Sequence, residues 1–445
     1  VLRNNATGEH MVGQLAWSGG YTFEFDLNAD PGGAGDAARL AFRLGPSAPG
    51  PLRILAAGET VSTPEVHLGL VFGDLDTAVQ AMHTHVRRSV LLPQPRGRGG
   101  WVESGIGPEI EITEASVYHA LENAAAFGAE VFFIDASWYA APHANWWDTC
   151  GDWDVSLERF PGGLPAIRDA VHAKDMLFGL WMDAERLGSN SRIAKEHPEW
   201  LATGYDTQRE PLGGLLDLTQ PVVAQWMEDQ IARVIEENQL EFFRLDYNTG
   251  NLVPGFFTER DGYIENGYWR YYEALYGIWE RLRARFPHVI LENCAGGGGR
   301  TDLGLVRYFS HTWVTDWQIA PRSFTITNGM SMALPPEFVD RLVGGQNGHI
   351  AGDLDFQLRL LLFVRPSLSF LSPMDISLNP VMMARVNHMV DLYKRIMRPM
   401  RPTGRMYHHT PAFDGPEPKG WGVLETASED RRQAALSRAR CEVRH

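Results

Sequence analysis

Short apolar runs alternate with amphipathic stretches through most of the chain after residue 100. The runs have the length of buried strands, and their alternation with helical patterns is typical of a parallel sheet. They cover residues 100–104, 130–135, 176–182, 241–246, 288–292, 311–316, 331–334 and 366–370. Eight strands, most of them followed by a helical stretch, predict an α/β fold of the (β/α)8 or TIM barrel type.

The helical stretches carry their own start and stop signals. In the stretch 114–127 the apolar residues fall on one face, and Gly128 can end the helix in a left-handed conformation. In the stretch 220–237 we expect Thr219 to be the N-cap, with Pro221 in the first turn. Similar helices are predicted at 75–92, 266–285, 354–363 and 380–398. A doubly wound open sheet is the competing fold, but it normally has a Gly-rich phosphate-binding turn after an early strand, and this sequence shows none.

The two ends of the chain differ from this pattern. Residues 1–92 contain β-rich runs followed by a linking helix, and Pro93–Gly100 is a linker. The barrel is expected over residues 98–400. Residues 401–445 contain one strand pattern, Gly420–Glu425, followed by Arg- and Ala-rich sequence without a β pattern. We therefore expect a truncated or frame-shifted C-terminal β region.

Composition and charge narrow the function. The formal net charge of −15 argues against binding to nucleic acids or anionic membranes and fits a neutral small-molecule substrate. The three cysteines, Cys150, Cys294 and Cys441, form neither a disulfide framework nor a CxxC zinc pair. No apolar run has the length of a membrane span, and the sequence, which starts at Val1, shows no basic segment followed by an apolar one. We therefore expect a cytoplasmic location.

Polar residues stand at the ends of most of the predicted strands. The clearest is Asp246, which ends an apolar run. The others are Glu103, Asp135, Asp183 with Glu185, Glu292 with Asn293 and Cys294, and Asp316. Because the strand tips of a parallel barrel meet at one mouth, we expect these groups to share a site. Two carboxylates across a pocket are the minimum for cleaving a glycosidic bond, since one attacks the sugar or activates water while the other protonates the leaving oxygen.

Metal binding, phosphate binding and nucleophilic catalysis by cysteine are other possible uses of such residues. Clustered acids can bind a metal, but His311 begins its strand instead of ending it, so no metal is predicted. The glycine run 296–299 allows a ligand to approach the backbone, but no Lys-Ser/Thr follows it as in a phosphate loop. Cys294 lacks a His partner and suits a pocket wall better than a nucleophile. Arg244 points to the same side as Asp246, where it could keep that carboxylate ionised, bind a sugar hydroxyl, or form an ordinary ion pair.

Several motifs taken together resemble the retaining α-galactosidases of glycoside hydrolase family 36, the melibiase-like group. The motifs are Asn4–Glu9 with Gln14, Gly151–Val155, Glu158–Leu164, Phe178–Trp181, Glu292–Arg300 with Asp302, and Trp313–Asp316. The resemblance covers nearly the whole chain in matching order and spacing. It implies a partial N-terminal β-sandwich before the barrel, no cofactor, and a possible homo-oligomer.

The resemblance also implies roles for individual residues. Asp246 would be the nucleophile that forms a covalent glycosyl-enzyme, and Asp316 would be the general acid and then the base. The substrate-binding residues would be Asp135, Trp138, Asp152, Trp153, Trp181, Arg244, Asn248, Cys294, Gly296, Gly297 and Arg300. Among them, Cys294 and the glycines would border the sugar's O2, and Arg300 would orient the acids. The implied reaction removes terminal α-linked galactose from oligosaccharides or glycoconjugates with retention of configuration.

Three departures from the family pattern leave the sugar open. The family's Asp-Asp-Gly-Trp is Asp135–Trp138 here, with Ala136 in place of the second acid. Its Lys-Trp-Asp is Arg244–Asp246, and its Glu-Pro-Glu is Asp183–Glu185. The alternatives are therefore an α-N-acetylgalactosaminidase, glycosyl transfer as in raffinose synthases, and a non-catalytic sugar-binding barrel. Both β regions are shorter than those of the family, which predicts that the sequence is a piece of a longer protein.

Overall fold

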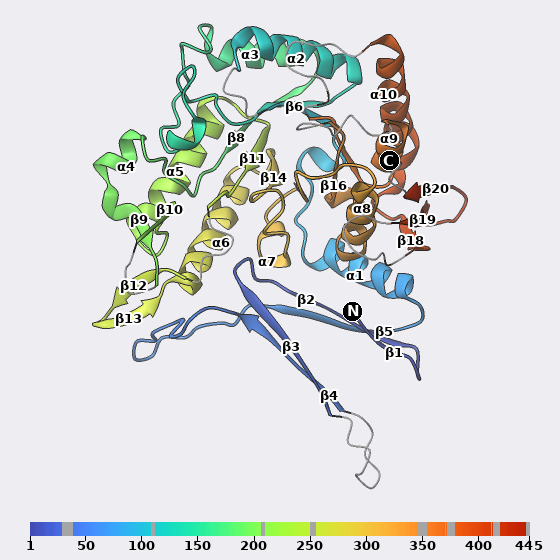
Figure 1. Ribbon diagram of the computed structural model, residues 1–445, viewed down its shortest axis with the longest axis horizontal. Coiled ribbons are helices and arrows are strands. Elements are labelled where there is room, and N and C mark those ends of the chain that lie inside the picture. The colour runs from blue at the N-terminus through green and yellow to red at the C-terminus, as the bar shows by residue number, and fades with distance from the viewer. Residues whose placement is uncertain are drawn as a thin grey trace.

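The computed structural model describes residues 1–28, 39–107, 112–205, 210–249, 255–344, 354–369, 371, 379–410, 412 and 419–441. Its centre is a parallel eight-stranded sheet in the order β15-β14-β11-β8-β7-β6-β17-β16 (Figure 1). A parallel bridge between Thr312 and Val339, beside the two end strands, closes the sheet into a ring. The predicted (β/α)8 barrel is confirmed.

The barrel strands are short and, with few exceptions, fully buried. They are β6 (Glu103–Ile106), β7 (Val131–Ile134), β8 (Leu177–Met182), β11 (Phe242–Leu245), β14 (Ile290–Asn293), β15 (His311–Thr312), β16 (Asp340–Leu342) and β17 (Arg365–Ser367). Seven of them overlap the predicted apolar runs, because a strand covered on both faces reads as a continuous apolar segment. Two hairpins extend the loops after β8 and β11, namely β9 (Leu201–Thr203) with β10 (Pro211–Leu216), and β12 (Phe257–Arg260) with β13 (Tyr263–Asn266).

Helices surround the strands and pack their apolar faces on them (Figure 1). They are α1 (Leu75–Ser89), α2 (Glu114–Phe127), α3 (Gly163–His172), α4 (Arg192–Glu196), α5 (Pro221–Glu237), α6 (Tyr268–Arg285), α7 (Leu303–Val306), α8 (Arg322–Ala333), α9 (Leu354–Leu361), α10 (Pro380–Leu392) and α11 (Arg398–Met400). Helix α2 ends at Gly128 with a φ of 80°, as predicted. The N-cap of α5 is Gln220, and the prediction of Thr219 is wrong. The Thr219 hydroxyl instead donates to Asp217 at 2.6 Å, within the turn that precedes the helix.

The seventh predicted strand is also wrong. Residues 331–333 are the end of α8, and the strand β16 lies at Asp340–Leu342. The apolar run near Leu334 has the length of a strand but belongs to a helix end. The true strand begins with Asp340 and Arg341, which are charged although the structure buries them. Because this barrel strand begins with charged residues, the sequence has no apolar run that would identify it as a buried strand.

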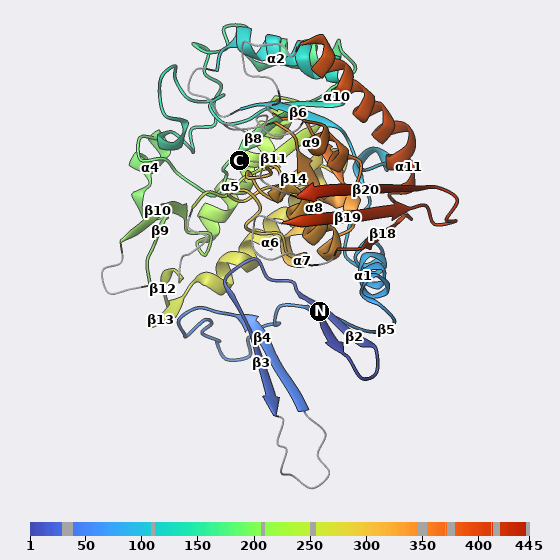
Figure 2. The same ribbon diagram turned by 45° about the vertical axis from the view of Figure 1, so that its right-hand side comes forward.

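The N-terminal region lies at one end of the barrel (Figures 1 and 2). Strands β1 (Leu2–Asn4), β2 (Glu9–Leu15) and β5 (Val66–Phe72) form an antiparallel sheet against α1, and β3 (Tyr21–Asn28) pairs with β4 (Arg39–Pro46) as a hairpin. This agrees with the β-rich pattern predicted for the start of the chain.

The C-terminal region is more ordered than its sequence suggested. Strands β18 (Arg405–His408), β19 (Gly420–Ala427) and β20 (Ala434–Cys441) form an antiparallel sheet (Figure 2). The expectation that no β pattern follows Glu425 is wrong for β20. Its inward positions include Ala439 and Cys441, which pack near Phe324, and such small residues give only a weak alternation of apolar and polar positions. In the part of the chain that the structure describes, no helix is both long enough and apolar enough to cross a bilayer.

Candidate active site

Asp246 lies directly after β11 at the carboxyl end of the barrel, and it is 9% exposed. Its Oδ1 accepts hydrogen bonds from the backbone N–H groups of Tyr247 at 2.8 Å, Ala295 at 3.1 Å and Gly296 at 2.8 Å. The indole N–H of Trp181 donates to its Oδ2 at 3.2 Å. Four N–H donors therefore hold this carboxylate and stabilise its negative charge without cancelling it.

The turn after β14 brings a second carboxylate to the same place. Ala295, Gly296, Gly297 and Gly298 all have positive φ angles, a run for which glycine is the suitable residue. A Cβ on Gly297 would lie 2.9 Å from Oδ2 of Asp316, so this glycine lets the aspartate approach the turn. The two predicted catalytic aspartates thus contact one short segment, the glycine turn 295–298.

Asp316 differs from Asp246 in its exposure. It is exposed, and its Oδ1 accepts a hydrogen bond of 2.8 Å from the indole N–H of Trp313. Cys294 lies near both acids, and its thiol has a pKa well above its usual range because of burial and of the charges of Asp246 and Asp316. A thiol kept neutral in this way is unreactive, which fits the expected pocket wall better than a nucleophile.

Hydrogen bonds and aromatic rings hold the guanidinium of Arg244 in place. Its Nη1 donates to Asp135 at 3.0 Å, its Nε donates to Glu292, and its guanidinium lies 4.3 Å from the Phe133 ring and 4.2 Å from the Trp313 ring. Of the three interpretations of Arg244 from the sequence, this geometry fits the ion pair best. Burial raises the pKa of Asp135 to about 6, although Arg244 opposes the shift.

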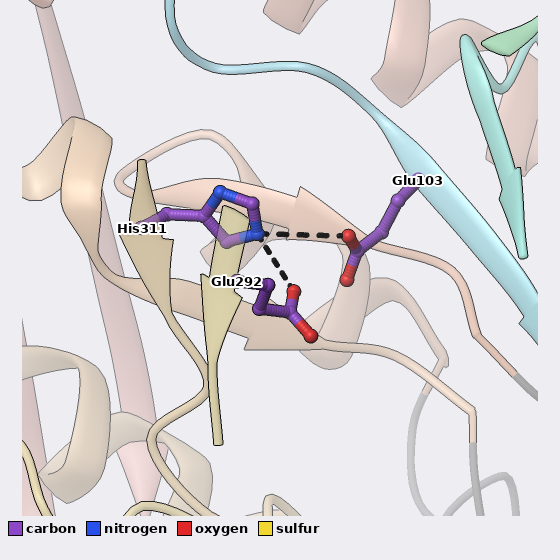
Figure 3. A group of neighbouring side chains, drawn as sticks. All are labelled: Glu103, Glu292 and His311. Carbon is purple, nitrogen blue, oxygen red and sulfur yellow. Dashed lines mark hydrogen bonds and ion pairs between the residues drawn. The ribbon is translucent and has the colours of Figure 1, made fainter. Parts of the chain in front are cut away.

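The barrel interior holds a network of buried charged side chains that includes Arg244. Figure 3 shows three members of the network, Glu103, Glu292 and His311. The Nε2 atom of His311 is 2.7 Å from Glu292 and 3.8 Å from Glu103. Arg365 donates to Glu103 and to Asp340, at 2.6 Å each. Glu103, Glu292 and His311 have the ligand atoms that a metal would need within 4.8 Å of one another. However, Arg365 and Arg244 already bring positive charge to both glutamates, so we interpret the group as an ion network of the framework.

Three further predicted residues lie around Asp246. Trp181 contacts Asp246 directly. Trp138 contacts Trp181, because its indole N–H donates to the Trp181 carbonyl oxygen at 2.9 Å. Asn248 donates from Nδ2 to Asp183 at 3.2 Å. These residues come from β8 itself and from the loops after β7, β8 and β11, and these three strands are neighbours in the barrel.

Other predicted residues lie farther from the two aspartates. Arg300 makes a double hydrogen bond to Glu185, at 2.7 and 2.9 Å, and lies 4.0 Å from the ring of Tyr247. Asp152 accepts from the backbone N–H groups of Arg192 and Ile193 at the start of α4. Trp153 is buried and stacks on Trp138 with ring centroids 6.2 Å apart.

Two groups near the site are not predicted by the sequence pattern. Trp146 packs edge-on against Trp181, with centroids 5.2 Å apart. The sequence signal that could have identified Trp146 is the pair Trp146-Trp147, two adjacent aromatic residues in a polar loop. Arg365 and Asp340 were missed because no pattern marks a charged pair inside a strand.

Comparisons with known proteins agree with this architecture. The Melibiase family model matches residues 60–396. Alpha-galactosidase 2 of Pediococcus pentosaceus is 30% identical over 281 residues, which are 61% of this chain and 37% of that protein. Probable alpha-galactosidase C of Aspergillus flavus is 27% identical over 441 residues, 94% of this chain and 55% of that protein. The chain therefore spans between about a third and about half of the length of these relatives.

Solved structures show the same fold. A variant of the GH36 alpha-galactosidase AgaA from Geobacillus stearothermophilus, in complex with raffinose, has a TM-score of 0.80 at 21% identity, over 98% of this chain and 64% of that one. The alpha-galactosidase from Lactobacillus brevis has a TM-score of 0.76 at 22% identity, over 97% of this chain and 62% of that one. The family model matches well over half of the residues, and the chain belongs to the melibiase family.

Proposed function

We propose that this chain carries the catalytic site of a retaining α-glycosidase that removes terminal α-linked galactose from oligosaccharides. The observation that carries the proposal is the glycine turn 295–298, which binds Asp246 through its N–H groups and packs Gly297 against Asp316. One turn thus sets the positions of two carboxylates, the minimum that glycoside hydrolysis requires. The similarity to alpha-galactosidases of several organisms supports galactose as the sugar.

The two carboxylates suit different steps. Asp246 is buried and held by four donors, so it has a fixed position from which to attack the anomeric carbon as Asp316 protonates the departing glycosidic oxygen. Asp316 is exposed and can exchange protons with water, which suits a group that first gives a proton to the leaving oxygen and then takes one from the attacking water. Hydrolysis of the glycosyl-enzyme returns Asp246 to its carboxylate form.

The sugar would lie against a wall of neutral and aromatic groups. Trp181 donates to the nucleophile, the neutral thiol of Cys294 lies near both acids, and the lack of a side chain at Gly297 makes room for Asp316. Asp135 is the acid that the sequence retains where the family has two, and Arg244 holds it in place. Ala136 removes one polar contact from this side, so a sugar bearing a larger substituent is the competing substrate.

A panel of p-nitrophenyl glycosides tests the proposal: α-galactoside, α-N-acetylgalactosaminide, α-glucoside and β-galactoside. We expect release from the α-galactoside, and analysis of products at high acceptor concentration separates hydrolysis from transfer. Azide then assigns the two roles. In Asp246→Ala, azide should attack the anomeric carbon in place of the carboxylate and give a β-galactosyl azide. In Asp316→Ala, azide should instead open the glycosyl-enzyme and give an α-galactosyl azide. The same azide anomer from both variants would contradict the assignment.

A further inference from the structure

Asp183 stands beside Asp246 at the carboxyl end of the barrel. Strands β8 and β11 are parallel neighbours in which Met182 pairs with Leu245, so the next residue of each strand, Asp183 and Asp246, falls at the same level. Paired residues of parallel strands point to the same side of the sheet. Two carboxyl groups therefore lie on adjacent strand tips, and both are buried.

Their hydrogen-bond partners are unequal. Four N–H groups donate to Asp246. Asp183 is 0% exposed, its Oδ2 accepts one hydrogen bond from Asn248 at 3.2 Å, and its Oδ1 is buried without a partner among the described residues. Two neighbouring carboxyl groups resist carrying two charges, and the group with more donors takes the charge. The geometry thus makes Asp246 the carboxylate and leaves the proton on Asp183.

We propose that Asp183 is a positioning residue that acts as an un-ionised carboxylic acid: it holds the amide of Asn248 at the site and leaves Asp246 as the single negative charge at this point. Asn248 is only partly buried, so fixing its amide fixes a polar group that faces the mouth of the barrel. The activity part of this inference rests on the proposed function. The protonation part does not.

The groups around Asp183 support a neutral acid. Burial raises the pKa of Asp183 to about 7, and the charges of Asp246 and Glu185 act in the same direction, while Arg186 and the hydrogen bond from Asn248 oppose them. Arg186 has other partners, since it donates to the carbonyl oxygen of Gly213 at 3.3 Å and stacks on Trp147. Tyr139 and Cys150, from the segment after β7, lie near Asp183. Their own pKa values are raised, mainly by burial.

The first test uses stability and needs no substrate. In unfolded chains Asp183 has its ordinary pKa of 3.8, against about 7 in the folded protein. The folded state therefore holds this proton more tightly, and the wild type loses stability as the pH rises from about 4 to 7, whereas Asp183→Asn does not. Near pH 4 we expect the same melting temperature for Asp183→Asn and the wild type. As the pH rises, the melting temperature of Asp183→Asn should exceed that of the wild type by a growing margin, which reaches several degrees and levels off above pH 7. Asp154→Asn, at an exposed carboxylate, is the matched control and should show no such trend.

The second test uses turnover of p-nitrophenyl α-galactoside at pH 6. Asp183→Asn keeps an oxygen for Asn248 and is neutral, so kcat and KM should stay within about threefold of the wild type. Asp183→Ala releases Asn248, so KM should rise at least about fivefold with kcat nearly unchanged, a loss equivalent to roughly 1 kcal/mol of binding. A loss of more than a hundredfold in Asp183→Asn, or a melting-temperature margin that does not change with pH, would overturn the inference. A wild type that is inactive on every glycoside, with the pH-dependent margin present, would reject the proposed function and support the neutral Asp183.

Discussion

The interior and the mouth of the barrel both contain buried acids, but different partners hold them. In the interior, Glu103 binds Arg365 and Glu292 binds Arg244, so each carboxylate faces a cation. At the mouth, Asp246 is bound by backbone and indole N–H groups that carry no net charge. The cations cancel the interior charges, whereas neutral dipoles stabilise the charge of Asp246 and leave it available. The kind of partner, more than burial, separates framework acids from an acid that can react.

The largest effect is expected at the mouth and on activity alone. Asp246→Asn keeps the shape of the side chain and removes the attacking oxygen, so we expect kcat on a glycoside substrate to fall by roughly 10⁴-fold or more, about 5 kcal/mol of activation free energy. Because no described residue forms an ion pair with this carboxylate, no buried cation is left behind and the denaturant midpoint should move little. Turnover and unfolding of the same preparation measure both. Substantial residual turnover would remove Asp246 from the role of nucleophile.

The reverse outcome is expected in the interior. Arg365→Met removes the cation that pairs with Asp340 and with Glu103, and breaking a buried ion pair in this way typically costs about 3–5 kcal/mol of unfolding free energy. Chemical denaturation measures the loss. Arg395→Met is the control, since Arg395 forms an exposed pair with Asp391 and its removal should leave the midpoint unchanged. If both variants unfold at the same denaturant concentration, the interior network is not a stabilising framework.

These two regions were predictable from the sequence to different degrees. The acids of the mouth follow apolar strands, so Asp246 and Asp316 could be found at strand ends and assigned to one site. The register that places Gly297 against Asp316 could not, because it depends on how β14 and β15 pair and on a turn with consecutive positive φ angles. In the interior, Asp340 and Arg341 replace the apolar residues by which a buried strand is recognised, and β16 was therefore missed.

A smaller effect is expected at the turn that joins the two proposed catalytic acids. Gly297→Ala puts a side chain on a residue with a φ of 76° and within 2.9 Å of Asp316, so strain of about 1–3 kcal/mol and a displaced Asp316 should result. A displacement near 1 Å can reduce kcat roughly a hundredfold. Gly262→Ala is the matched control, because its φ is 79° and no atom of the described residues lies within 4 Å of the new Cβ. It should lose similar stability and keep its activity. Equal activity losses in both variants would mean that strain alone, without contact to Asp316, explains the effect.

The smallest effect is expected at Asp152, a carboxylate that belongs to neither region. Its two oxygens accept the N–H groups of Arg192, at 2.7 Å, and Ile193, at 3.3 Å, which would otherwise be free at the start of α4. Asp152→Ala should therefore cost about 1 kcal/mol of stability, as the loss of a helix cap does, with KM for a glycoside changed by less than about twofold. Denaturant unfolding and a KM measurement on the same sample decide between a capping role and the substrate-binding role that the family resemblance implies. A tenfold rise in KM with an unchanged unfolding midpoint would place Asp152 at the sugar, and Asp152 would then join Asp246 as an acid at the substrate that neutral N–H donors hold.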